Sequence, residues 1–250
     1  MSKEPIINIS QLVKKYKGSS ANAVDSLDLI INEGDIFGLL GPNGAGKTTT
    51  ISMLCSLISP NSGSIIIAGT KLNGNNNKLK KIIGVVPQEI ALYENLTAKE
   101  NLDFFGNMYG LGGKTLKDKI ELYLNKFSLK DKSDKLVNTF SGGMKRRLNL
   151  ITGLLHSPKI LFLDEPTVGI DVQSKNVIIE YLKELNREGT TIVYTSHLME
   201  EAEIFCTNIS IIDFGKEITK GTPKQLIETN KDCNNLEEIF LKLTGRSVRT

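Results

Sequence analysis

One glycine-rich segment stands out in the sequence: Gly41-Pro42-Asn43-Gly44-Ala45-Gly46-Lys47-Thr48, followed by Thr49. It fits the pattern G-x-x-x-x-G-K-[ST], in which glycines let the backbone curl until its N–H groups point at phosphate oxygens. Lys47 adds a positive charge for the β- and γ-phosphates, and Thr48 offers a hydroxyl to Mg²⁺. The pattern therefore indicates a phosphate-binding P-loop.

The flanking residues supply the setting that this loop requires. Residues 36–40 form a short apolar run typical of a buried parallel strand, and a helix is expected to start near Gly46. A strand, a glycine loop and a helix in this order aim the positive end of the helix at the bound anion. The alternative, a glycine-rich turn with no chemistry, does not explain this order.

Composition narrows the class of protein. The chain has 250 residues, 40% of them hydrophobic, which favours one large domain or a core with a smaller lobe. Its net charge of +3 is small, which argues against a nucleic-acid partner. Its three cysteines lack C-x-x-C spacing, which fits a reducing cytosol, and Cys55 is expected in the core. No apolar run approaches the roughly 18 residues that span a bilayer. Work at a membrane would need another chain.

Apolar patterns on both sides of the P-loop predict further elements. We expect strands at 27–31, 64–68, 82–86, 160–163 and 191–196, a flexible loop at 74–77, a helix at 174–188 and a hairpin at 208–219. Residues from 222 onward are weakly helical, and 245–250 are expected to be frayed. Tyr16 is either an aromatic residue at a strand end or a ring that stacks on adenine.

Residues 89–155 have a helical texture and predict a lobe inserted into the α/β core. Thr97 and Glu100 form a capping box, and a second helix is expected at 116–127. Ser141 is a good N-cap for a third helix, and Gly142 and Gly143 leave its first N–H groups uncovered. This helix is either ordinary and capped, or a second anion site with positive charge from residues 145–147.

Acidic residues follow the apolar run at 160–163. Asp164 and Glu165 lie where a buried parallel strand ends, which is the edge at which α/β proteins place their sites. With a P-loop, the pair is interpreted as Asp164 for Mg²⁺ and Glu165 for the attacking water. His197 follows another strand at the same edge. His156 is expected in a loop and has no assigned role.

In this order, these motifs resemble one family, the ATP-binding subunits of ABC transporters. The resemblance covers about residues 6–222 and includes the P-loop at 41–48, Gln88, Ser141-Gly142-Gly143, the run 160–165, Asp171 and His197. The segments 93–102 and 141–147 look more like the ABC-2 exporter branch. We call Ser141-Gly142-Gly143 the signature segment.

The resemblance implies a role for each motif. Tyr16 stacks on adenine, Gln88 contacts Mg²⁺ and the lytic water, Glu165 is the general base, and His197 holds the γ-phosphate. Lys47 is counted with these catalytic residues, and Thr48, Gln88 and Asp164 are the expected Mg²⁺ contacts. The signature segment contacts the ATP held by a second subunit, and Asp171 lies at that dimer interface.

The resemblance also implies a fold and partners. It predicts an α/β P-loop NTPase (RecA-like) core at 1–88 and 156–221, an inserted helical subdomain at 89–155, an N-terminal antiparallel β region, and a helical tail at 226–250 beyond a domain spanning 1–225. ATP and Mg²⁺ are the expected cofactors. The expected partners are a separate transmembrane permease and a second ATP-binding subunit, either a second copy or a paralogue. The expected location is the cytoplasmic face of the plasma (inner) membrane.

One departure and two alternatives accompany this interpretation. Met144 stands where the family more often has Gln, which removes an amide but leaves the Ser141 hydroxyl and the glycine N–H groups, so we expect activity. A soluble ABC ATPase acting on ribosomes, DNA or proteins usually has two cassettes or a long coiled coil, and no sustained heptads lie between Thr48 and Ser141. An importer subunit often has a longer C-terminal regulatory domain.

Overall fold

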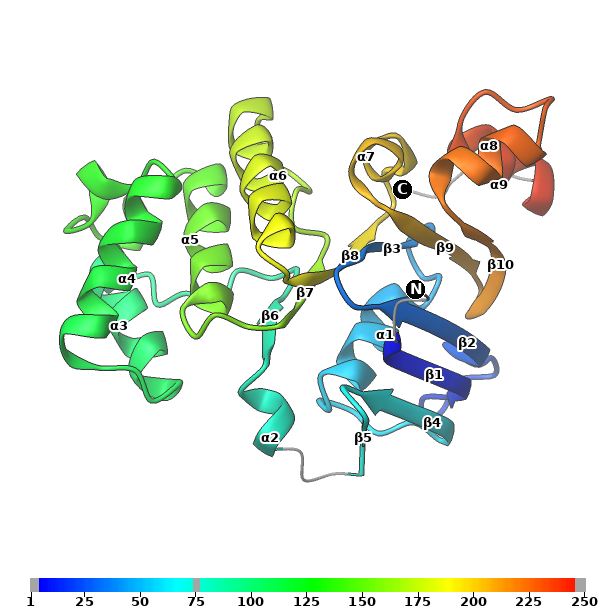
Figure 1. Ribbon diagram of the computed structural model, residues 1–250, viewed down its shortest axis with the longest axis horizontal. Coiled ribbons are helices and arrows are strands. Elements are labelled where there is room, and N and C mark those ends of the chain that lie inside the picture. The colour runs from blue at the N-terminus through cyan, green and yellow to red at the C-terminus, as the bar shows by residue number, and fades with distance from the viewer. Residues whose placement is uncertain (1–4, 74–76, 246–250) are drawn as a thin grey trace. The chain divides into compact units, whose positions relative to one another are not determined.

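The computed structural model describes residues 5–73 and 77–245 (Figure 1). The predicted loop at 74–77 and the predicted frayed end at 245–250 lie almost entirely outside these residues. The chain forms two compact units, which we call the first unit (Met1–Leu79 with Thr191–Thr250) and the second unit (Lys80–Thr190). The division means that the second unit is one continuous segment, whereas the first unit is built from both ends of the chain.

An antiparallel sheet forms the N-terminal part of the first unit. Its strand order is β2-β1-β4-β5, with bounds β1 Pro5–Lys14, β2 Val24–Asn32, β4 Ser62–Ile67 and β5 Thr70–Lys71. Alternate residues of β2 are buried (Leu27, Leu29 and Ile31), because successive side chains of a strand point to opposite faces. The predicted N-terminal antiparallel region is confirmed.

Parallel pairing fixes the strand that leads into the P-loop. In the first unit β3 (Ile36–Leu40) pairs in parallel with β8 (Thr191–Ser196) and with β9 (Asn208–Asp213), and all five of its residues are buried. Gly38 is opposite Tyr194 on one side and Ile209 on the other. A β-carbon on Gly38 would come within 2.8 Å of the Cys206 sulfur, so only glycine fits.

The remaining elements of the first unit follow the sequence pattern with differences at their ends. They are α1 Lys47–Leu54, α2 Asn77–Lys80 (which crosses into the second unit), α7 Met199–Phe205, β10 Lys216–Gly221, α8 Pro223–Thr229 and α9 Leu236–Thr244. The predicted hairpin is confirmed as β9 and β10. The expectation that Cys55 packs in the core is wrong: it is the C-cap of α1 and only half-buried.

The C-terminal helices are better defined than the sequence pattern indicated. Thr222 and Gln225 form a capping box on α8, and the Asn235 side chain accepts a bond from Glu238 N at the start of α9. Leu236, Ile239 and Phe240 are buried, and the Leu236 N–H donates to Glu203 of α7. Two short capped helices therefore pack within the first unit, with α9 in contact with both α7 and α8.

The second unit contains one pair of parallel strands and a group of helices. Its elements are β6 Ile83–Val86, α3 Ala98–Met108, α4 Gly113–Lys126, η1 Lys130–Lys132, η2 Val137–Thr139, α5 Gly142–Leu154, β7 Ile160–Asp164 and α6 Val172–Arg187. Strand β6 pairs in parallel with β7, and α3, α4 and α5 lie between them in the chain (Figure 1). The predicted α/β fold with an inserted helical region is confirmed.

N-terminal caps explain where two of these helices begin. The predicted box on α3 is present, since Thr97 Oγ1 accepts from Glu100 N while the Glu100 carboxylate accepts from Thr97 N. Helix α6 begins two residues before the predicted start because Asp171 is its N-cap. The two compact units do not test the predicted domain boundaries, which are 89–155 for the helical subdomain and 225 for the end of the ATP-binding domain. These boundaries stay a prediction.

His156 lies in the loop after α5 and has a well-defined environment. Its ring stacks on Tyr109, with centroids 3.8 Å apart, and its Nε2 lies 2.9 Å from the Ile83 carbonyl oxygen. Its Nδ1 is buried without a hydrogen-bond partner. Burial lowers the pKa of His156 below its ordinary value, with a smaller opposing effect from the bond to Ile83 and a further lowering by Lys119.

The lowered pKa of His156 predicts how stability depends on pH. The unfolded chain binds this proton at higher pH than the folded chain, so stability is retained above the ordinary pKa of 6.5 and falls as pH drops below it. In His156→Gln we expect the fall in thermal midpoint between about pH 7.5 and about pH 5.5 to be smaller than in the wild type by about 1–3 °C. Equal falls in the two proteins would contradict this assignment.

Candidate functional site

The P-loop is clamped by backbone atoms of the first unit. The Gly41 N–H donates to the Ser196 carbonyl at the end of β8, and the Gly215 N–H donates to the Ala45 carbonyl. Gly41 and Gly46 have φ of 156° and 105°, and a β-carbon on either would overlap a backbone carbonyl oxygen, of Ile212 and Ala23 respectively. The glycines of the pattern are therefore required by both conformation and space.

Lys47 lies inside this loop. Its side chain is buried, and its Nζ donates to the carbonyl oxygens of Gly41 at 2.8 Å and Pro42 at 3.2 Å. Gly46 caps α1 without a side-chain hydrogen bond to the first helical turn. An ammonium group and backbone N–H groups at a helix N-terminus are thus gathered at one place, which is the arrangement that binds phosphate.

The other P-loop residues differ in exposure. Pro42 and Ala45 are buried, as is Thr50 of the helix that follows, whose Oγ1 donates to the Gly46 carbonyl at 2.9 Å. Asn43, Gly44 and Thr48 are exposed, so the loop crest and the Thr48 hydroxyl can meet a ligand.

Tyr16 and His197 lie beside the P-loop in the same unit. Tyr16 is 46% exposed, its hydroxyl lies 3.3 Å from Thr49 Oγ1, and Lys14 Nζ lies 5.6 Å from its ring centroid. An exposed ring that contacts the P-loop helix is available to stack on a base. His197 follows Ser196, whose carbonyl accepts from Gly41, so the fold brings it to the base of the loop.

The acidic pair and Gln88 are brought together in the second unit. Asp164 ends β7, and Asp164 and Glu165 are both buried. Gln88 follows β6, the strand paired with β7, and its Nε2 lies 3.5 Å from Glu165 Oε2. Glu165 has φ of 48°, a left-handed backbone in which a side chain is strained. The predicted edge of carboxylates is thus present, with the amide of Gln88 beside it.

The signature segment contacts Asp171. Ser141 is the N-cap of α5 and accepts from Met144 N at 3.3 Å, as predicted. Asp171 Oδ1 accepts from Ser174 N at 2.8 Å, and that bond, with a smaller effect from Arg147, lowers the pKa of Asp171. A β-carbon on Gly143 would overlap Ser174 Oγ and lie 2.7 Å from Asp171 Oδ2, whereas one on Gly142 would meet open space.

The sequence did not reveal which of the basic residues 145–147 has a defined role. Arg146 turns inward: its Nη1 donates to the carbonyls of Pro87 and Gln88, and its Nη2 to that of Glu165. Arg147 donates instead to the carbonyls of Gly143 and Phe127. Three adjacent basic side chains look alike in a sequence, and only the helix orientation separates them.

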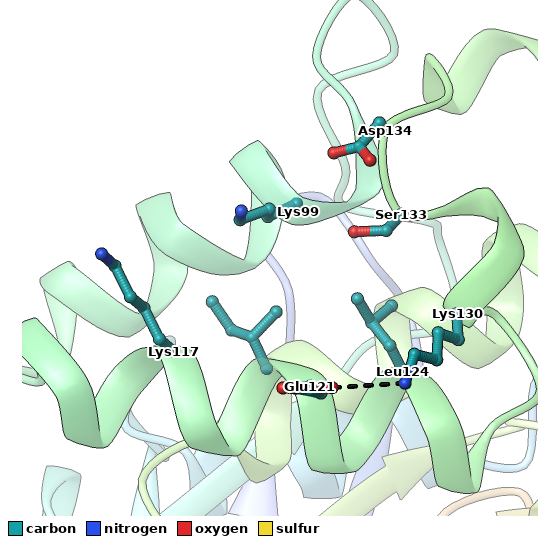
Figure 2. A pocket seen from close by; sticks show the side chains of 8 residues that line it. Lys99, Lys117, Glu121, Leu124, Lys130, Ser133 and Asp134 are labelled. Atoms are coloured by element: carbon teal, nitrogen blue, oxygen red, sulfur yellow. Dashed lines mark hydrogen bonds and ion pairs between the residues drawn. The ribbon is translucent and has the colours of Figure 1, made fainter.

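A pocket of about 420 Å³ lies elsewhere in the second unit, between α3, α4 and the η1 region (Figure 2). Ile120 and Leu124 contribute apolar side chains to it, and Lys130 is paired with Glu121 at 3.2 Å. Its other lining residues are Lys99, Lys117, Ser133 and Asp134. It contains none of the predicted site residues, and we assign it no ligand.

Comparison with known proteins gives one family. The family described as "ABC transporter" matches residues 24–168. The chain is 48% identical to the linearmycin resistance ATP-binding protein LnrL of Bacillus subtilis (86% of this chain, 68% of that protein). It is 39% identical to the Nod factor export ATP-binding protein I of Ralstonia nicotianae (93% and 72%). A solved dimeric ATP-binding cassette, in a post-hydrolysis state bound to ADP and Pi, superposes with a TM-score of 0.79 at 27% identity (86% and 98%).

These findings define the class of protein, an ATPase with a P-loop. The chain belongs to the ABC transporter family. It is an ATP-binding and ATP-hydrolysing subunit of the exporter type. The buried ammonium, the uncapped helix N-terminus and the glycine backbone of the P-loop are a donor set that fits the phosphates of ATP.

The two signature glycines differ in a testable way. In Gly143→Ala the new methyl group overlaps Ser174, so we expect a loss of about 1–3 kcal/mol in the free energy of unfolding as well as lower ATPase activity. In Gly142→Ala the methyl group meets open space, so stability is kept and a loss of ATPase activity would report on the ligand. Urea titrations and ATPase assays of both variants make the test. Equal destabilisation by the two substitutions would contradict the packing described here.

Proposed function

We propose that this chain binds Mg²⁺-ATP in its P-loop, pairs head to tail with a second ATP-binding subunit, and powers export through a separate membrane-spanning chain. The observation that carries the proposal is the signature segment. Ser141 and Gly142 are exposed at the N-terminus of α5, and the space beside Gly142 is open. The N–H donors of such a segment can bind a phosphate, and a nucleotide held by a second subunit would supply one.

The second cofactor in this proposal is Mg²⁺. Within the part of the chain that the structure describes, no group of three or more His, Cys, Asp or Glu side chains could hold a metal ion by itself. Mg²⁺ usually keeps several waters and binds one or two protein oxygens together with substrate phosphates. The exposed Thr48 hydroxyl and the Asp164 carboxylate suit that mode, as does the Gln88 side chain.

The proposed catalytic roles follow the chemistry of each side chain. Glu165 is the general base for the attacking water, with Gln88 next to it to orient that water. Lys47 and His197 stabilise the negative charge of the γ-phosphate, and Tyr16 stacks on the adenine. Asp171 lies at the subunit interface, where it also caps α6.

Glu165→Gln separates binding from hydrolysis. The amide is similar in shape to the carboxylate but does not accept a proton from water, so we expect ATP hydrolysis to fall by about 100-fold or more while an ATP-bound dimer accumulates. Lys47→Ala removes the ammonium group that binds the phosphates, so neither ATP binding nor the dimer is expected. Analytical gel filtration with ATP and a phosphate-release assay distinguish the two variants. Parental turnover in Glu165→Gln would remove Glu165 from the base role.

An exposed apolar patch supports a membrane partner. We call it the α3 patch; it follows Gln88 in the chain and consists of Tyr93, Phe104 and Met108, whose exposed fractions run from 40% to 70%. Tyr93 and Phe104 form an edge-to-face ring pair with centroids 4.9 Å apart. The buried Asn101 holds Tyr93 in place by bonding to both its N–H and its carbonyl. Rigid apolar surface of this kind marks an interaction site.

No helix among the described residues is long and apolar enough to cross a membrane. We propose that the α3 patch binds the membrane-spanning chain at the cytoplasmic face of the membrane. No nucleic acid enters this proposal, since the charge of +3 is small.

Capture of partners tests this docking surface. In Phe104→Glu, a charge at the centre of the α3 patch is expected to lower the amount of polytopic protein captured from detergent-solubilised membranes by at least about tenfold. The matched control is Leu122→Glu, at an apolar residue of similar exposure on α4 outside the patch (49% against 40% for Phe104), which should capture the wild-type amount. Capture of only ribosomal or DNA-associated proteins by the wild type would favour the soluble-ATPase alternative instead.

A further inference from the structure

Three polar side chains of α5 bond to residues 87–94, which we call the Gln88 segment. Arg146 binds the carbonyls of Pro87 at 3.2 Å and Gln88 at 2.6 Å, and Asn149 Oδ1 accepts from Ala91 N at 3.1 Å. Lys145 forms an ion pair with Glu94. Helix α5, which begins at the signature segment, is therefore bonded to the Gln88 segment through three residues near its N-terminal end.

Arg146 is distinct among these because it reaches a second catalytic segment. Its Nη2 donates to the Glu165 carbonyl at 3.3 Å, while its Nη1 holds Gln88. The side chain is buried, and burial lowers the pKa of Arg146, with opposing effects from the nearby carboxylates of Asp164 and Glu165. An arginine stays charged in proteins, so this is a buried cation between two catalytic loops.

The geometry suits arginine and no other side chain. Three carbonyl oxygens from two loops accept from two nitrogens of one planar group, so the distance between the loops is set by the guanidinium itself. One of these carbonyls belongs to Glu165, whose left-handed backbone at φ of 48° needs support. A lysine has the charge but only one nitrogen on a flexible stem.

We propose that Arg146 is a positioning residue for ATP hydrolysis, which fixes Gln88 and Glu165 relative to each other and to the helix that carries the signature segment. The proposal rests on the proposed function of Gln88 and Glu165. Arg146 itself touches neither ATP nor water in this role. Contact made at the signature segment is then transmitted through one rigid helix to the base and to the amide that orients the water.

Misplaced catalytic groups lower turnover and leave ligand binding intact, and this gives the test. For Arg146→Met we expect kcat to fall by about 10- to 100-fold, because a shift of about 1 Å in a catalytic group has an effect of that size. The Kd for ATP should stay within about twofold of the wild-type value, since the P-loop residues are unchanged. Arg146→Lys, which retains the charge, should recover only part of the loss.

The experiment measures kcat, the Kd for ATP and the thermal midpoint in the full chain at a temperature well below unfolding. Lys126→Met is the matched control, because Lys126 is a partly buried cation of the same unit that bonds Glu184 at 2.7 Å and lies outside the site. It should keep wild-type turnover. The ATPase rate of the wild type tests the proposed function. The ratio of kcat in Arg146→Met to kcat in the wild type tests the role of Arg146.

A second measurement separates positioning from a merely structural role. In a Glu165→Gln background, Arg146→Met should still form the ATP-bound dimer, because dimer formation does not need the base. Loss of that dimer would overturn the proposal and make Arg146 a support for the signature segment. A kcat within about twofold of wild type in Arg146→Met, or full recovery by Arg146→Lys, would overturn it as well.

Discussion

Close contact between backbones is the constraint on which the nucleotide-binding part depends. The carbonyl groups of Ala23 and Ile212 occupy the places where β-carbons of Gly46 and Gly41 would be. The P-loop therefore packs closely against the turn before β2 and against the end of β9, two segments that are far apart in the sequence. The Ser196 carbonyl adds a third support. A loop held in this way presents its N–H groups to phosphate without having to reorganise, and this is how a small set of donors binds a highly charged ligand.

In the second unit, side chains rather than backbone contacts fix the loops that carry the proposed catalytic groups. The segments after β6 and β7 carry the groups proposed for catalysis, yet they are loops, and loops alone are poor at fixing distances. Arg146 and Asn149, one turn apart on α5, bond directly to the backbone of these segments. Buried polar bonds of this kind are expensive to leave unmade, so they select one arrangement of the loops. The same helix begins at the signature segment, and a single rigid element thus serves both.

The order of elements and most candidate residues could be predicted from the sequence because their signals are local. The run at 36–40, the P-loop pattern and the box at Thr97 each depend on neighbours within a few residues. The inward turn of Arg146 and the contact of Gly143 with Ser174 depend on how helices are rotated and packed, which a periodic pattern does not specify. Cys55 was misplaced for a related reason, since apolar spacing continued past the residue where α1 ends. The roles of the site residues remain predictions.

Glu165 has a further consequence for attempts to engineer the chain. At φ of 48° its backbone lies where glycine or asparagine would be at ease and a longer side chain is strained. Local conformational energy and the proposed chemistry therefore favour different residues at this one position. A procedure that optimises thermal stability alone would replace this glutamate and, on the proposed chemistry, obtain a more stable protein that no longer hydrolyses ATP. Stability gained elsewhere in the molecule, at the well-ordered helices of the second unit for example, carries no such conflict.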